Sequence, residues 1–153
     1  MFEVSKILIV YASLTGNTEE IAELIAEGIQ AAGSEVVLKM VDECSAVELL
    51  KYDAFMLGAY TWGGGELPDE FLDFVEELEE LDLQGRPAAV FGSGDTGYPI
   101  YCGAVDELED RLKAWGAALV QGGLKIEYGP SQEEKGKCRD FGRTFVQSLD
   151  IVT

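Results

Sequence analysis

Hydroxyl and amide side chains gather near the start of the chain, in the stretch Ser13-Leu14-Thr15-Gly16-Asn17-Thr18. An apolar run at 7–11 precedes this stretch and a segment of helical period at 19–32 follows it, so a strand is predicted to turn there into a helix. Hydroxyls and backbone N–H groups at the positive end of a helix favour a bound anion, above all a phosphate. An ordinary helix N-cap is the alternative explanation of the same residue types.

The composition of this stretch limits the kind of phosphate that it could hold. It contains no Lys or Arg, and it matches neither the GxxxxGK[ST] pattern of triphosphate-binding loops nor the GxGxxG pattern of dinucleotide folds. A neutral cradle of N–H groups and hydroxyls suits a monophosphate ester that is held without a counter-cation.

Glycines and aromatic residues fill two later stretches, each of which follows an apolar run. Trp62 stands before three glycines within 60–65, and residues 93–103 combine glycines with Tyr98 and Tyr101. Aromatic side chains can cover a flat ring, and glycines let a backbone approach it closely. Packing of the same aromatics on the core is the alternative. The three stretches together predict a ligand in which a phosphate is joined to a planar ring.

Apolar runs of strand type alternate with segments of helical period along the whole chain. The strands are expected at 7–11, 35–40, 54–59 and 88–92, followed by a weaker pair at 118–121 and 124–127. The helices are expected at 19–32, 69–78, 105–115 and 131–148, with a shorter one at 45–51. This alternation predicts one α/β domain over 1–153, with a parallel sheet covered on both faces. Such sheets bind ligands outside the carboxyl ends of their strands, which is where the three stretches fall.

Composition excludes several classes of protein. The three cysteines form no CxxC pair and the chain has no histidine, so a zinc ribbon, a dithiol motif and a Ser-His-Asp triad are all excluded. Cys102 is therefore expected to be a structural thiol, and any redox chemistry requires an organic cofactor. No apolar run approaches the length of a membrane span and the first residues do not resemble a signal peptide, so the cytoplasm is the expected location.

The formal net charge of −18 bears on partners. Nucleic acid and anionic membranes would be repelled by it, whereas a basic protein partner would be attracted. Simple solubility is the alternative explanation of the charge. The acids include a run within 66–82 that contains no Lys or Arg.

The chain resembles the flavodoxins of the short-chain type over nearly its whole length. The residues that carry the resemblance are 13–18, then Thr61-Trp62-Gly63, then 93–98 and 101–106. The resemblance implies a doubly wound αβα sandwich (flavodoxin-like) with a five-stranded parallel sheet in the order 2-1-3-4-5, and noncovalently bound FMN. Two positions depart from the family pattern: Leu14 stands where many relatives have a hydroxyl, and Tyr60 stands where relatives have a small serine.

The resemblance also assigns roles within the site. Residues 13–18 would hold the phosphate, while Trp62 and Tyr98 would cover the two faces of the isoalloxazine ring. The backbones of Gly63, Gly64, Asp95, Ile100 and Cys102 would meet the polar edges of the ring. The cofactor-binding residues expected on this basis are Ser13, Leu14, Thr15, Gly16, Asn17, Thr18, Tyr60, Thr61, Trp62, Gly63, Gly64, Ser93, Gly94, Asp95, Tyr98, Ile100, Tyr101 and Cys102; no metal ligand is expected.

The implied function is that of a low-potential single-electron carrier rather than an enzyme. Gly63 would permit a backbone rotation that stabilises the semiquinone, and the acids of 66–82 would disfavour the anionic hydroquinone. The expected partners are basic redox proteins, such as a flavodoxin reductase and acceptor enzymes, met transiently by a monomer. A small FMN-dependent quinone reductase is the main alternative, and a receiver-like regulatory domain is a lesser one.

Overall fold

Six parallel strands form one sheet in the computed structural model, which describes residues 6–13, 16–61, 67–94 and 102–152. The strands are β1 (Lys6–Tyr11), β2 (Glu35–Met40), β3 (Ala54–Tyr60), β4 (Pro87–Gly94), β5 (Ala118–Leu119) and β6 (Leu124–Glu127). Their order is β2-β1-β3-β4-β5, with β6 also paired to β4, so the predicted order is confirmed. The fold is the expected flavodoxin-like α/β class.

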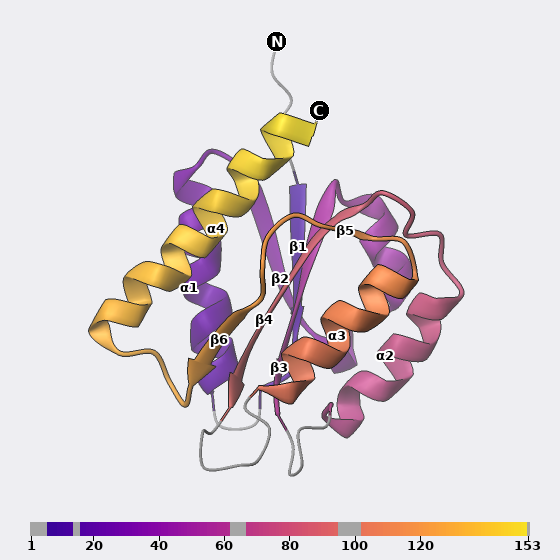
Figure 1. Cartoon of the computed structure of the whole chain (residues 1–153), viewed down its shortest axis with the longest axis horizontal. Helices are drawn as coiled ribbons and strands as arrows, with labels where there is room; N and C mark the ends of the chain where they lie inside the picture. The colour runs from indigo at the N-terminus through magenta and orange to yellow at the C-terminus, as the bar shows by residue number, and fades with distance from the viewer. Residues whose placement is uncertain (1–5, 14–15, 62–66, 95–101, 153) are drawn as a thin grey trace.

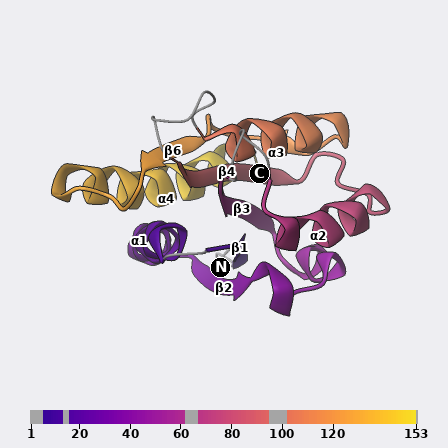
Figure 2. The same ribbon diagram turned by 90° about the horizontal axis from the view of Figure 1, so that it is seen from below.

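Helices cover both faces of this sheet (Figure 1). They are α1 (Asn17–Ala31), α2 (Asp69–Glu79), α3 (Gly103–Ala114) and α4 (Gln132–Val152), with 3-10 turns η1 (Val41–Glu43) and η2 (Ala46–Lys51). The view from below separates α1 and α4 from α2 and α3 across the sheet (Figure 2). The central strands must therefore be apolar on both sides, and they are.

Alternation along β1 builds two separate cores. Leu8 and Val10 pack with the apolar faces of α2 and α3, whereas Ile7 and Ile9 pack with those of α1 and α4. All four side chains are completely buried. The β1 strand is thus packed against both helical layers, and this packing fixes the position of the loop that follows its carboxyl end.

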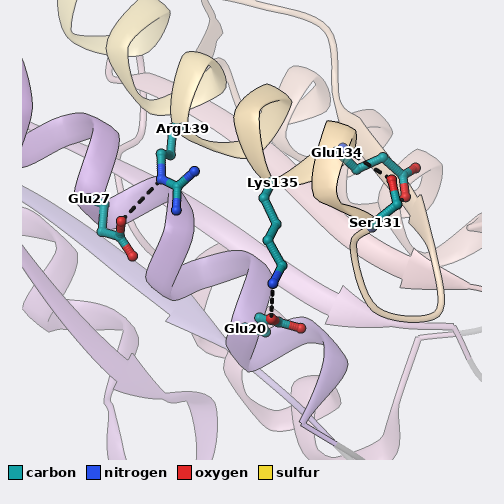
Figure 3. A network of polar contacts seen from close by, with 6 residues as sticks. All are labelled: Glu20, Glu27, Ser131, Glu134, Lys135 and Arg139. Atoms are coloured by element: carbon teal, nitrogen blue, oxygen red, sulfur yellow. Dashed lines mark hydrogen bonds and ion pairs between the residues drawn. The ribbon is translucent and has the colours of Figure 1, made fainter.

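Two glycines allow α1 and α4 to approach each other closely. A Cβ on Gly28 would lie 1.9 Å from the carbonyl oxygen of Arg139, and one on Gly142 would lie 2.2 Å from that of Ile25. Ion pairs flank the contact, with Arg139 Nε 3.1 Å from Glu27 Oε1 and Lys135 Nζ 3.8 Å from a carboxylate oxygen of Glu20 (Figure 3). Because the backbones themselves touch, the position of α1 depends on α4.

The start of α4 follows its sequence signal. Glu134 N–H donates to Ser131 Oγ at 3.2 Å and Ser131 N–H donates to Glu134 Oε1 at 3.0 Å, which is the capping box predicted by Ser-x-x-Glu (Figure 3). The helix continues to Val152, beyond the expected end at 148. Within the part of the chain that the structure describes, no helix combines the length and the apolar character needed to cross a membrane.

Several boundaries differ from those expected from sequence. The β3 strand extends to Tyr60 and β4 extends to Gly94, because Ser93 pairs with Tyr60 on one side and with Ile126 on the other. Ser93 and Gly94 therefore lie in a strand and not in the loop after it. The fifth strand is divided into β5 and β6, and the short helix expected at 45–51 is the 3-10 turn η2.

Candidate functional site

The carboxyl ends of β1, β3 and β4 lie side by side at one edge of the sheet, the lower edge in Figure 1. Ala12 N–H, just after β1, donates to the carbonyl of Gly58 in β3 at 3.0 Å. Thr61 N–H, just after β3, donates to the carbonyl of Ser93 in β4 at 3.1 Å. The ends of the three strands are thus hydrogen-bonded to one another, so the stretches predicted to bind one ligand begin side by side.

One hydroxyl group organises the backbone N–H groups in the turn after β1. Ser13 Oγ accepts N–H of Gly16 at 3.1 Å and N–H of Glu19 at 3.3 Å. Gly16 is the N-cap residue of α1 and has φ +89°, a left-handed conformation that favours glycine. No side-chain oxygen caps the helix at that position. The side-chain oxygen that caps the first turn therefore comes from Ser13, three residues before Gly16, so part of this stretch does serve as a helix cap.

The next two backbone N–H groups of α1, on Asn17 and Thr18, donate to no oxygen of a described residue. They stand at the positive end of a 15-residue helix. With no Lys or Arg in 13–18, the turn offers dipoles rather than full charge. This arrangement fits a phosphate monoester held by N–H groups and hydroxyls.

One buried contact joins the first turn of α1 to β4. Thr18 Oγ1 lies 2.8 Å from Ser93 Oγ, and the two residues are 1% and 4% exposed. They are 75 positions apart in the sequence. The phosphate-type turn and the glycine-rich stretch after β4 are therefore linked through side chains.

The junction between β4 and α3 is tightly packed. A Cβ on Gly94 would lie 2.8 Å from Cys102 Sγ and 3.0 Å from its backbone nitrogen. Cys102 is completely buried and has φ 51°, in the left-handed region that few non-glycine residues adopt. The predicted structural thiol is thus the residue from which α3 begins, and its side chain closes the space beside Gly94.

The chain after β3 is held from two sides. Thr61 Oγ1 accepts the N–H of Ala104 in α3 at 3.3 Å, and Tyr60 Oη donates to the carboxylate of Glu70 in α2. Burial, together with this carboxylate, raises the pKa of the Tyr60 phenol, so the phenol stays neutral at physiological pH. The stretch that carries Trp62 therefore begins directly after two residues whose side chains are hydrogen-bonded to α2 and α3.

Comparison with known proteins identifies the family of this chain. The sequence model of the family described as Flavodoxin matches residues 9–142. The chain belongs to the flavodoxin family. "Probable flavodoxin 2" of Bacillus subtilis strain 168 is 49% identical over 144 residues, covering 94% of this chain and 95% of that protein. The flavodoxin of Maridesulfovibrio salexigens is 43% identical over 133 residues, covering 85% and 91%.

Solved flavodoxins have the same fold. The crystal structure of oxidised flavodoxin 1 from Bacillus cereus matches with a TM-score of 0.90 at 47% identity, covering 94% of this chain and 98% of that one. The crystal structure of oxidised flavodoxin 2 from the same organism matches with a TM-score of 0.86 at 49% identity, covering 97% and 100%. As a flavodoxin, the chain is an FMN-binding electron carrier and not an enzyme. Family membership favours this function over the quinone reductase and receiver alternatives.

Half of the residues expected to bind FMN lie in the described part of this flavodoxin. They meet at the carboxyl edge of the sheet and comprise Ser13, Gly16, Asn17, Thr18, Tyr60, Thr61, Ser93, Gly94 and Cys102. The other nine lie outside the described residues: Leu14, Thr15, Trp62, Gly63, Gly64, Asp95, Tyr98, Ile100 and Tyr101. For both groups, contact with FMN itself stays a prediction.

A fourth segment borders this edge and was missed from sequence. Tyr128 N–H, just after β6, donates to the carbonyl of Gly94 at 2.9 Å. A Cβ on Gly129 would lie 3.1 Å from Asn17 Oδ1, so this turn also adjoins the start of α1. The available signal was that 124–127 ends at the same sheet edge as the other strands, and that a glycine and a proline follow it.

The stability of this flavodoxin at alkaline pH should reveal the contribution of the hydrogen bond between Tyr11 of β1 and Glu19 of α1. Tyr11 Oη donates to Glu19 Oε2 at 3.1 Å, and burial, with this carboxylate, raises the phenol pKa from 10.0 to about 12. The folded protein holds this proton more tightly than the unfolded chain does, so the contribution to stability is complete below pH 10 and is lost as pH rises towards about 12. In urea unfolding followed between those pH values, Y11F should lose stability less steeply than wild type; equal slopes would contradict the assignment.

Proposed function

We propose that this flavodoxin carries single electrons at low potential between a reductase and acceptor redox enzymes. It would do so in the cytoplasm, as a monomer in which residues 1–153 form one FMN-binding domain. The observation that supports FMN as the carrier group is the neutral turn at the N-terminus of α1, joined through Thr18 and Ser93 to the glycine-rich stretch after β4.

The phosphate end of FMN would be held by 13–18, and the ring by the stretches after β3 and β4. When bound, FMN supplies one-electron redox chemistry that no side chain of this protein provides. Ser13 keeps the turn folded by accepting the N–H groups of Gly16 and Glu19, and the N–H groups of Asn17 and Thr18 would face the phosphate. A phosphate so placed needs no cation, because the helix dipole and hydrogen bonds stabilise its charge.

Tyr60 would border the site without lending its hydroxyl to the phosphate. That hydroxyl donates to Glu70, so it is directed to α2. Where relatives have a small serine, this chain thus has a wall whose far end is attached to the neighbouring helix. Thr61, fixed by Ser93 and Ala104, carries the chain from this wall towards Trp62.

A strongly acidic surface adjoins this edge. The exposed acids on and just after α2 are Asp69, Glu70, Asp73, Glu76, Glu77, Glu79, Glu80 and Asp82, with no Lys or Arg between 67 and 82. The buried face of α2 consists of Phe71, Phe74, Val75 and Leu78, so the helix presents its carboxylates outward. Such a surface attracts a basic partner over distance and favours fast, weak encounters.

Two measurements test this proposal. Anaerobic redox titration of the FMN-loaded protein should give two separated one-electron steps with a very negative second potential; a single two-electron step would contradict the carrier function. The reduction rate by a basic flavodoxin reductase should fall about tenfold as salt rises from low to physiological strength and beyond.

Charge-removing variants locate the partner surface. D73N and E76Q, on the exposed face of α2, should slow reduction at low salt and flatten its dependence on salt. E133Q, in the first turn of α4, removes one exposed charge on another helix and serves as the matched control. Equal effects of all three changes would indicate that only net charge matters, and would contradict docking on α2.

A further inference from the structure

We propose that Ser93 sets the preference of this flavodoxin for a phosphorylated flavin by acting through Thr18, as a positioning residue. The inference rests on the proposed function, since it places the phosphate of FMN at the N-terminus of α1. Its basis is the contact of 2.8 Å between Thr18 Oγ1 and Ser93 Oγ, which connects α1 to the end of β4.

Both hydroxyls of this pair are shielded from solvent. Thr18 is 1% exposed and Ser93 is 4% exposed, so bulk water competes little for the hydrogen bond between the two hydroxyls. The backbone of Ser93 is fixed as well, because its carbonyl accepts Thr61 N–H at 3.1 Å and it lies in register with Ile126 of β6. The hydroxyl of Ser93 is therefore presented to Thr18 from a rigid strand.

Each hydroxyl has one hydrogen, and either oxygen of the pair could be the donor. If Thr18 donates to Ser93, only its lone pairs remain to face an anion at the start of α1. If Ser93 donates instead, Thr18 Oγ1 accepts and keeps its own hydrogen free to donate to a phosphate oxygen. The second arrangement stabilises a bound phosphate, next to the N–H groups of Asn17 and Thr18.

This mechanism acts on the phosphate alone. Losing the Ser93 hydroxyl would leave Thr18 without the group that orients it, and would weaken any ligand that carries a phosphate. A flavin without phosphate would bind nearly as before, because loss of the hydroxyl alone leaves the backbone of Ser93 and the stretches after β3 and β4 in place. The affinity ratio of FMN to riboflavin is therefore the quantity that Ser93 controls.

The test uses apoprotein of wild type and S93A, with flavin fluorescence quenching to measure FMN and riboflavin, and inorganic phosphate as a competitor. S93A should lower the affinities for FMN and for inorganic phosphate by about tenfold each and change the affinity for riboflavin by less than about twofold. S93T restores a hydroxyl and should recover most of the affinity for FMN. S34A removes a serine of similar burial at the turn between α1 and β2, and should change none of the three.

A double variant separates positioning from direct contact. S93A should add little to T18V, because Ser93 acts only through the threonine hydroxyl. Additive losses, equal weakening of FMN and riboflavin by S93A, or unchanged FMN affinity would each overturn the proposal. If S93A fails to fold, S93C keeps the volume with a weak donor and should show the same selective loss. Wild-type apoprotein that binds neither flavin would instead overturn the proposed function.

Discussion

Gly28→Ala is expected to lower the free energy of unfolding of the apoprotein by about 2–3 kcal/mol, although alanine is the better helix former. The added Cβ would lie 1.9 Å from the carbonyl oxygen of Arg139 and 2.8 Å from its carbonyl carbon. Both are backbone atoms, so no side chain can rotate away and α1 must separate from α4. Urea unfolding of the apoprotein measures this loss without the added stability that FMN binding confers.

Gly136→Ala is the matched control for this change. Gly136 also lies inside a helix, α4, but a Cβ there would meet nothing within 4 Å. It should raise stability by about 0.5–1 kcal/mol through helix propensity alone. If both substitutions stabilised the protein, that result would contradict the close backbone contact between α1 and α4.

Gly94→Ala is expected to weaken FMN binding by about tenfold to a hundredfold. Its Cβ would lie 2.8 Å from Cys102 Sγ and 3.0 Å from Cys102 N, where the strand enters the predicted ring-binding stretch and the helix leaves it. The buried cysteine cannot move into solvent, so the two ends of that stretch must spread. Titration of apoprotein with FMN, followed by flavin fluorescence, gives the dissociation constant.

Gly122→Ala serves as the control for Gly94. Gly122 is exposed between β5 and β6, and a Cβ there would have no neighbour within 4 Å. FMN affinity should not change in this variant. Wild-type affinity in folded Gly94→Ala protein would contradict the claim that the junction with Cys102 sets the geometry of the site.

Local signals predicted most of the fold. The apolar run at 35–40 coincides with β2, and the capping box at Ser131 marks the start of α4 within one residue. Convergence of three stretches on one edge followed from the rule for parallel sheets and needed no distances. These features depend on neighbours in the sequence, or on the periodicity of one element.

The features that sequence did not predict depend on residues far apart in the chain. Ser93 and Gly94 have weak strand propensity, but β6 pairs with both residues and β3 pairs with Ser93, and this pairing extends β4. The contact of Thr18 with Ser93 spans 75 positions and leaves no periodic trace. The turn at Tyr128 was missed for the same reason, because its place beside Gly94 comes from strand order.

The pairing of β6 with β4 has a consequence for synthesis on the ribosome. Gly94 accepts its hydrogen bond from Tyr128, and α1 is covered by α4, the last helix among the described residues. A nascent chain of which only about the first 100 residues have emerged therefore lacks the turn at Tyr128, which borders the site, and the helix α4, which covers α1. Complete folding of the site therefore requires that the chain has emerged from the ribosome through α4.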